Sequence, residues 1–214
     1  KAKKVGYNGS VRANIDSRAR IGAGGDFNIR GQKLNLFGNA MYNQRKSIST
    51  GKTTRLQMTD NPDTYFNQND KNTSIGNFRF IRLGADFFID NRNTLTVNGN
   101  FVKGKFEPFS VNDILVDTLS NPKNSSSFLR TSNTLGEFRN MGSQLSFKHN
   151  FPKAGREWTA DATFNASKNN NANDIRTDTF NLPSYTIRNT AKQQQITNGD
   201  NKNITIQTDY STPL

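Results

Sequence analysis

The sequence has no cysteine, a single histidine and no long hydrophobic run. Without cysteine the chain can form neither a disulfide nor a thiolate metal site. With His149 as its one histidine, it cannot build a histidine dyad or a site with several histidine ligands. The longest apolar runs stay below the 18 or more residues of a transmembrane helix, so such a helix is excluded. A membrane-spanning β-sheet is not excluded, because its only signal in a sequence is the alternation of apolar and polar residues.

Hydrophobic residues are also few, at 32% of the chain, a proportion that raises the possibility of disorder. The aromatic residues argue against disorder, because the 16 Phe, 5 Tyr and 1 Trp lie mostly within alternating segments. A sheet that is apolar on one face and wetted on the other needs fewer apolar residues than a two-layer sandwich. The composition therefore favours a one-faced sheet.

The net charge of +12 would suit a polyanionic partner, either nucleic acid or the anionic headgroups of a membrane. The basic residues are spread through the chain and do not cluster in one segment. We therefore expect a generally basic, solvated surface and no nucleic-acid partner.

Residues 76–106 show the pattern on which the rest of the chain is built. One face of the first arm carries apolar residues and the other carries polar residues and glycine, and the second arm repeats this alternation. A period of two over ten or more residues is that of a β-strand. The turn at residues 90–93, Asp-Asn-Arg-Asn, consists of residues that favour turns. The apolar sets are Ile81, Leu83, Ala85, Phe87 and Ile89, and Leu95, Val97, Gly99 and Phe101.

The same alternation recurs along the chain and predicts about eight strands. They cover residues 5–15, 20–30, 33 to about 46, the two arms of 76–106, 138–151, 157–168, and a last strand from about 202. Three polar stretches, at about 47–75, 107–137 and 169–201, are predicted to be long loops that all leave one end of the sheet. Loops of this length are uncommon in compact soluble domains.

Long strands with short turns at one end and long loops at the other are typical of outer-membrane barrels. The predicted fold class is therefore all-β: an antiparallel up-and-down meander of about eight long strands that forms part of a transmembrane outer-membrane β-barrel, with outer-membrane lipid around it. Four aromatic residues near the short-turn end are expected at the membrane interface, namely Phe87, Phe88, Phe151 and Trp158. The alternative is an autonomous secreted or surface β-sheet module for adhesion or binding.

Several stretches resemble a known family. They are GYNGSVRANI after a lysine cluster, KLNLFGNAMYNQRKS, FIRLGADFFIDNRNTL with one inserted residue, NGNFVKGKFEP, LSFKHNFPKAGREWTADATF and TIQTDYSTPL. In order and spacing they are similar to the barrel domain of Bacteroidetes outer-membrane β-barrel proteins, which are TonB-dependent-receptor-like. The resemblance implies that residues 1–4 are a plug-to-barrel junction and that residues 5–214 are the first part of a larger barrel.

The resemblance also implies a function and partners. The implied function is uptake of a nutrient such as a glycan or siderophore, without catalysis and without a cofactor. The implied partners are the plug domain, the remaining barrel strands, an inner-membrane energy-coupling protein and a surface lipoprotein. Aromatic residues in the predicted loops are candidates for ligand contact, namely Tyr65, Phe66, Phe109, Phe128, Phe180 and Tyr185.

No residues in the sequence form a convincing catalytic or metal site. The loop carboxylates lack the dense spacing of a calcium loop, and no nucleophile stands beside a base. Asp86 and Asp161 fall on polar strand faces and are expected to face the barrel lumen, near Arg79 or Arg82. We expect them to pair across the wall, and we expect that the protein is not an enzyme.

Overall fold

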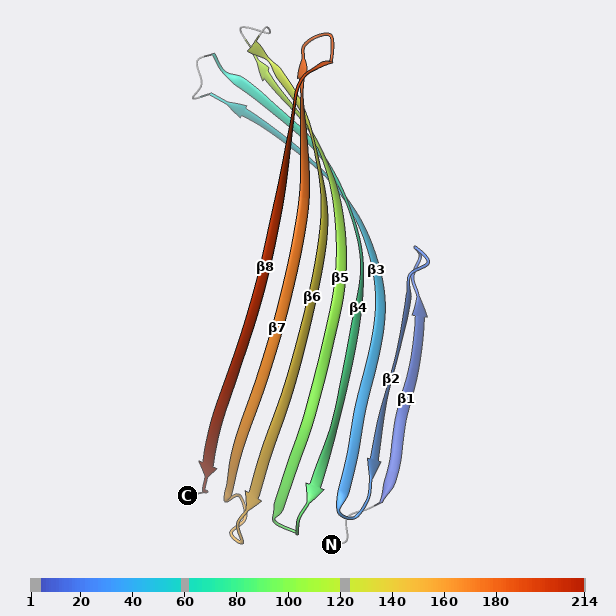
Figure 1. Cartoon of the computed structure of the whole chain (residues 1–214), viewed down its shortest axis with the longest axis vertical. Helices are drawn as coiled ribbons and strands as arrows, with labels where there is room; N and C mark the ends of the chain where they lie inside the picture. The colour runs from blue at the N-terminus through green and yellow to red at the C-terminus, as the bar shows by residue number, and fades with distance from the viewer. Residues whose placement is uncertain (1–4, 59–61, 120–123, 214) are drawn as a thin grey trace.

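The computed structural model describes residues 5–58, 62–119 and 124–213, which form one antiparallel sheet of eight strands in chain order (Figure 1). The predicted all-β meander is thus confirmed. The N-terminal junction predicted for residues 1–4 lies outside the described residues. The strands are β1 (Gly6–Ile15), β2 (Ile21–Arg30), β3 (Leu34–Gln57), β4 (Thr64–Phe88), β5 (Asn93–Thr118), β6 (Ser126–Asn150), β7 (Glu157–Asn181) and β8 (Thr186–Ser211).

The three long loops predicted for residues 47–75, 107–137 and 169–201 are wrong, because most of these residues are strand. Strands β3 to β8 are each 24 to 26 residues long. Ile48 in β3 pairs with Thr73 in β4, far beyond the last apolar residues of the alternating pattern, and the register between the two strands does not shift. In these parts apolar residues such as Ile48 and Phe109 are scattered among polar ones, so the regular apolar alternation disappears. The ladder continues nevertheless, because each neighbouring strand supplies the backbone partners.

The first hairpin is shorter than the rest, since β1 and β2 have 10 residues each. In the turn between them, the Asp16 carboxylate accepts the N–H groups of Arg18 (2.8 Å) and Arg20 (2.9 Å), and Ala19 adopts a left-handed φ of 54°. Arg18 Nη1 also donates to the carbonyl of Lys46 (3.1 Å). The hairpin therefore ends beside the middle of β3 (Figure 1).

The turn predicted at residues 90–93 is confirmed. Asp90 Oδ1 accepts the backbone N–H groups of Arg92 (2.7 Å) and Asn93 (2.8 Å), and Asp90 Oδ2 accepts Asn93 Nδ2 (2.7 Å). The hydrogen bond from the Asn93 amide and those from the two backbone N–H groups lower the pKa of Asp90. The carboxylate thus closes the turn that sets the register of β4 and β5.

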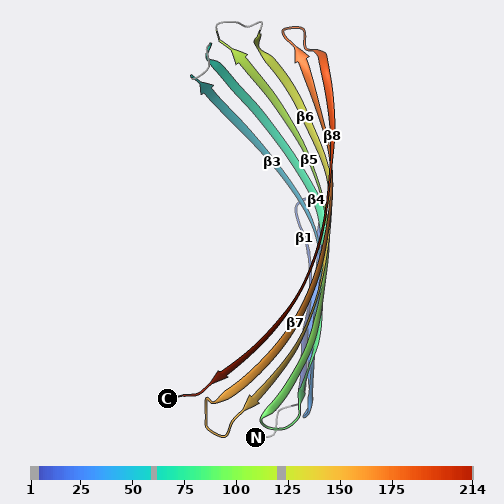
Figure 2. The ribbon, with the colours of Figure 1, turned by 60° about the vertical axis from the view of Figure 1, so that its left-hand side comes forward.

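The sheet is curved (Figure 2), and its two faces differ in exposure. Along β6, every odd-numbered residue from Asn133 to Leu145 is exposed, and every even-numbered residue between them is half-buried or buried. The odd positions therefore lie on the convex face and the even positions on the concave face. The convex face carries the predicted apolar sets: Ile81, Leu83 and Phe87 are 46%, 55% and 44% exposed. Polar residues such as Asn98 lie on the concave face.

The sheet is open and has no closed apolar core. Strand β1 pairs only with β2, and β8 only with β7, so the two edge strands do not meet. Among the described residues, the hydrophobic core consists of Ile175 alone. The alternating Leu, Val and Phe side chains therefore point away from the sheet and do not meet across a dry centre.

Candidate functional site

The concave face carries a network of polar side chains that extends across neighbouring strands. Asn35 on β3, which is 7% exposed, donates its Nδ2 to Asp86 on β4 (3.0 Å), and Thr96 on β5 donates its hydroxyl to the same carboxylate (2.7 Å). Since Asp86 accepts from both of its neighbours, three strands are joined through one carboxylate. Sequence reasoning did not detect Asn35 or Thr96, because it could not pair the strands.

A second set of contacts continues the network toward β7. Asn98 on β5 donates its Nδ2 to the amide oxygen of Gln144 on β6 (3.1 Å), and Gln144 donates its Nε2 to Asp161 on β7 (3.3 Å). Asp86 and Asp161 do lie on the predicted polar face, but their partners are amides and a hydroxyl. The predicted pairing with arginine is wrong.

The two arginines expected near these carboxylates contact aromatic rings instead. Arg82 lies over the Phe37 ring on the concave face, with its guanidinium carbon 5.8 Å from the ring centre. Arg79 lies on the convex face with its guanidinium 5.7 Å from the Tyr42 ring. In β4 the two arginines are three residues apart, so alternation places them on opposite faces.

Phenylalanine rings on the concave face lie over glycines of the neighbouring strand. A Cβ at Gly104 would lie 2.2 Å from the Phe138 ring, and a Cβ at Gly84 would lie 2.3 Å from the Phe37 ring. The rings therefore use the space that a side chain would occupy, which is how an aromatic residue covers a glycine in a strand pair. Polar amides and ring-covered glycines together make up the face opposite the apolar one.

Three of the four predicted interface aromatics lie at the short-turn end of the sheet on its convex face. Phe87 is exposed there. Trp158 packs edge-on against Phe147 at 5.7 Å and donates its Nε1 to the Thr208 hydroxyl (2.8 Å). Phe151 packs edge-on against Tyr210 at 5.9 Å. These residues, with Phe147 and Tyr210 added by the structure, form the aromatic cluster, namely Phe87, Phe147, Phe151, Trp158 and Tyr210.

Phe88 does not belong to this cluster. It follows Phe87 in the same strand and therefore lies on the concave face, where the Arg30 guanidinium is 5.1 Å from its ring centre. The interface position predicted for Phe88 is wrong, because adjacent residues of a strand point to opposite faces.

The six ligand candidates lie near the outer ends of the strands, which are the ends opposite the aromatic cluster, but the fold does not bring them together. Tyr65, Phe109 and Phe180 share the face of the apolar sets, whereas Phe66 and Phe128 share the opposite face. The Arg55 guanidinium lies 5.5 Å from the Phe66 ring. A single aromatic platform therefore does not exist at these positions.

Tyr185 is the candidate with the most distinctive surroundings. It lies in the turn between β7 and β8 with a left-handed φ of 53°. Its side chain borders a polar cavity of about 370 Å³ that we call the outer hollow, lined also by Lys52, Asn67, Asn69, Asp113, Leu115 and Ser127. A ring beside amides, a lysine and a carboxylate is an arrangement that can bind a polar ligand with one flat face.

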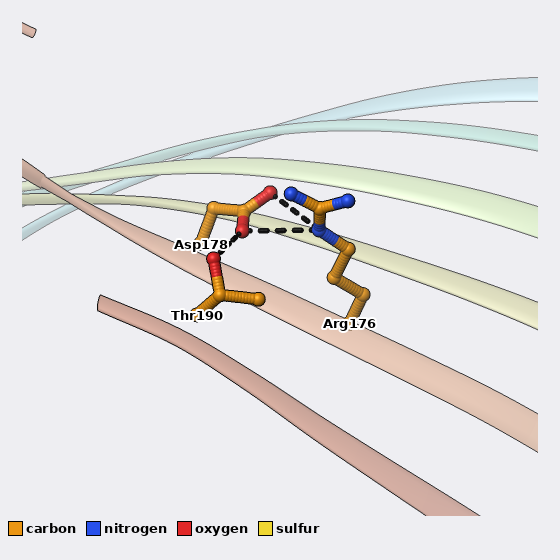
Figure 3. Close-up of polar contacts among 3 residues, drawn as sticks. All are labelled: Arg176, Asp178 and Thr190. Carbon is orange, nitrogen blue, oxygen red and sulfur yellow. Dashed lines mark hydrogen bonds and ion pairs between the residues drawn. The ribbon is translucent and has the colours of Figure 1, made fainter. Parts of the chain in front are cut away.

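The hairpin that carries Tyr185 is held by the Asp178 carboxylate (Figure 3). Thr190 on β8 donates its hydroxyl to Asp178 (2.5 Å), and Arg176 Nε donates to both carboxylate oxygens at 3.0 and 2.9 Å. The Thr190 hydroxyl, and then Arg176, lower the pKa of Asp178 against the opposing effect of its burial. The contact joins β7 to β8 close to the register shift at Thr179 and Phe180.

The described residues contain no group of three or more His, Cys, Asp or Glu side chains that could hold a metal ion. His149 places its Nδ1 2.7 Å from the Asn93 amide oxygen and stacks edge-on with Phe151 at 4.5 Å. Its role in the structure is thus a contact between β5 and β6. Nor do these residues form a helix with the length and apolar character needed to cross a membrane.

Comparison with known proteins supports the membrane assignment. Residues 149–214, which contain β7 and β8, match the model of the outer membrane protein beta-barrel family. The chain is part of a bacterial outer-membrane β-barrel. Among solved structures, Pseudomonas aeruginosa OccK8 (OprE) aligns over 95% of this chain and 96% of that chain, with 8% identity and a TM-score of 0.12. A TM-score this low does not establish a shared fold. No curated protein matches the chain.

The apolar outer face of a membrane barrel meets lipid, so we expect the convex face to lie in the hydrocarbon, and its apolar band has a definite height. On β4 the band runs from Phe87 in the aromatic cluster to Arg79, which is eight residues away. At ~3.3 Å per residue this is about 26 Å along the strand, or about 20 Å of depth for a strand tilted by ~40°, close to the ~25 Å band of such barrels. Strands β1 and β2, with 10 residues each, have the length of a membrane crossing. Strands β3 to β8 continue far beyond the band.

Proposed function

We propose that this chain forms part of the wall of a TonB-dependent outer-membrane receptor that takes up a nutrient such as a glycan or siderophore, without catalysing a reaction. The observation that carries the proposal is the division of one sheet into a convex apolar face and a concave polar face. A convex face in lipid encloses its concave face, so the polar network of Asp86 and Asp161 would line a passage for polar solutes.

The open edges support the existence of further barrel strands as partners. A strand edge presents unpaired N–H and C=O groups, and hydrocarbon cannot satisfy them. Strands β1 and β8 each have one neighbour in the sheet. In a membrane, their free edges require other strands that close the barrel around the concave face. A plug domain inside that barrel, an inner-membrane energy-coupling protein and a surface lipoprotein complete the proposed assembly.

The outer hollow lies on the convex side of the sheet beyond the apolar band, and it is suited to hold the nutrient at the outer surface before the nutrient enters the passage. Tyr185 supplies a ring, and Asn67, Asn69 and Asp113 supply polar groups around the same cavity. Sugar rings and flat chelates both combine an apolar face with polar edges, so stacking on Tyr185 and hydrogen bonding to the amides would act together.

The experiment compares growth of the source bacterium on a panel of limiting glycans and iron chelates. Deleting the gene should abolish growth on at least one nutrient, and deleting the energy-coupling protein should abolish growth on the same nutrient. Tyr185→Ala should reduce the uptake of that nutrient, and Tyr185→Phe, which keeps the ring, should not.

Other results would overturn the proposal. Uptake that depends on this gene but not on energy coupling would indicate a passive, porin-like channel. If the deletion strain grew normally on every nutrient but lost attachment to surfaces, the adhesion module would be the better explanation.

A further inference from the structure

Four basic residues that are far apart in the sequence lie side by side on the convex face. Arg79 on β4 is directly opposite Lys103 on β5, Lys103 is opposite Arg139 on β6, and Arg139 is opposite Lys168 on β7. All four are exposed. We call them the cation row. The four strands are neighbours (Figure 1), so at ~4.8 Å per strand spacing the row covers about 14 Å.

The cation row lacks the negative charges that would balance it. Like charges that are directly opposite on neighbouring strands repel and destabilise the pair. In the part of the chain that the structure describes, Lys103, Arg139 and Lys168 form no ion pair, and the Arg79 guanidinium lies over the Tyr42 ring.

The nearest carboxylates do not remove this excess. Glu107 is bound to Lys105 (3.0 Å). Glu137 is opposite the same lysine, one row farther from the membrane. Asp200 on the edge strand β8 is opposite Lys168 and faces only one end of the row. The arrangement therefore leaves a line of positive charge that an external anion would stabilise.

The position of the cation row identifies the anion. On each of the four strands, the next residue of the convex face toward the short turns is apolar: Ile81, Phe101, Met141 and Ala166. The row thus lies at the edge of the apolar band. Lys103, Arg139 and Lys168 also line a cavity of about 190 Å³, together with Glu137, Phe138 and Asn170. A phosphate placed there would meet three cations, while acyl chains attached to it would lie along the band.

We propose that the cation row binds the phosphorylated headgroup of a membrane lipid. Short turns of outer-membrane barrels face the periplasm, and the cation row lies at the end of the band away from those turns. The lipid therefore belongs to the outer leaflet, and its phosphate neutralises charges that otherwise repel one another. This inference rests on the outer-membrane location and does not depend on what the barrel transports.

The test uses the purified protein in detergent and measures lipid binding by native mass spectrometry and by titration with lipid A. The triple variant Lys103→Gln, Arg139→Gln and Lys168→Gln removes three charges from the row. The matched control Lys46→Gln, Lys71→Gln and Lys192→Gln removes three charges from lysines of the same face beyond the band. The row variant should bind lipid A about tenfold more weakly or worse, because charge-assisted hydrogen bonds to phosphate are lost. The control should bind as the unmodified protein does.

The proposal would be overturned if dephosphorylated lipid A bound as tightly as lipid A, or if both triple variants lost the same affinity for lipid A. It would also be overturned if inorganic phosphate at similar concentration displaced lipid A fully, since that would indicate a site for free phosphate. Folding of the row variant is checked by urea titration in phosphatidylcholine vesicles. Because the substitutions remove repulsion, the urea midpoint of the row variant in phosphatidylcholine vesicles should equal or exceed that of the unmodified protein. In vesicles that contain lipid A, the row variant should not be more stable than the unmodified protein. A lower midpoint in phosphatidylcholine would contradict the idea that the row is unbalanced without an anion.

Discussion

Leu83 provides the most direct test of which face of the sheet meets lipid. It is on β4, 55% exposed on the convex face, and it lies four residues from Phe87 at one edge of the apolar band and four from Arg79 at the other. At ~3.3 Å per residue it is about 13 Å from each edge along the strand, which is the middle of the band. Leu83→Arg therefore places a charge where the hydrocarbon is deepest.

The expected cost follows from that depth. Arginine on the lipid face of a barrel costs ~2–4 kcal/mol at the bilayer midplane and ~0–1 kcal/mol near the interface. For Leu83→Arg we expect the upper part of the first range. At 1.4 kcal/mol per factor of ten, a loss of about 3 kcal/mol lowers the folding equilibrium constant by more than a hundredfold.

The assay is urea unfolding of the protein in phosphatidylcholine vesicles, followed by the fluorescence of its one tryptophan. The matched control is Thr73→Arg, on the same strand and the same face but beyond Arg79, where the side chain would be in water. It should change the unfolding free energy by no more than ~0.5 kcal/mol. If the two substitutions cost the same, the convex face does not lie in hydrocarbon.

Three further predictions concern other parts of the sheet. Gly104→Ala should lower the unfolding free energy by ~1–3 kcal/mol in the urea assay, because its Cβ would lie 2.2 Å from the Phe138 ring. Gly51→Ala, whose Cβ would have no contact closer than 3.5 Å, should cost nothing, and equal costs would contradict the ring-over-glycine packing. The pKa of Asp178 is lowered from its ordinary value of 3.8, so its stabilising effect is complete above that pH and is lost as the pH falls through the lowered pKa. Asp178→Asn should therefore weaken the acid dependence of the unfolding midpoint, and an unchanged profile would show that the carboxylate stabilises nothing. The emission of Trp158 should be quenched more by lipids brominated near the headgroup than by lipids brominated at the chain ends, and the reverse order would remove it from the interface.

The half of the sheet near the short turns was predictable because the sequence of each strand there shows which of its residues face an apolar medium. Apolar residues at every second position, as at Ile81, Leu83 and Phe87, indicate a strand with one face in an apolar medium. The turn at residues 90–93 follows from side chains that hydrogen-bond to their own backbone. Both signals are local, so the strand count, the order and the apolar face could be read without coordinates. The error at Phe88 arose because its aromatic character was weighed without regard to its face.

The outer half of the sheet was not predictable, because its strands have no apolar period. Residues such as Ile48 and Thr73 adopt the strand conformation because each neighbouring strand supplies backbone hydrogen-bond partners. The sequence of either segment alone contains no pattern that indicates this pairing. Aromatic residues predicted to share a loop, such as Phe109 and Phe128, were separated onto different faces for the same reason.

The sequence by itself determined that this chain forms antiparallel strands with one apolar face, since alternation depends only on neighbouring residues. Only the tertiary structure decided which residues of different strands are adjacent. Arg79, Lys103, Arg139 and Lys168 are 24, 36 and 29 positions apart, and a shift of any ladder by one residue would move one of them to the opposite face. Their alignment, and the lipid site inferred from it, exists because cross-strand register is set by pairing over the whole length of the strands.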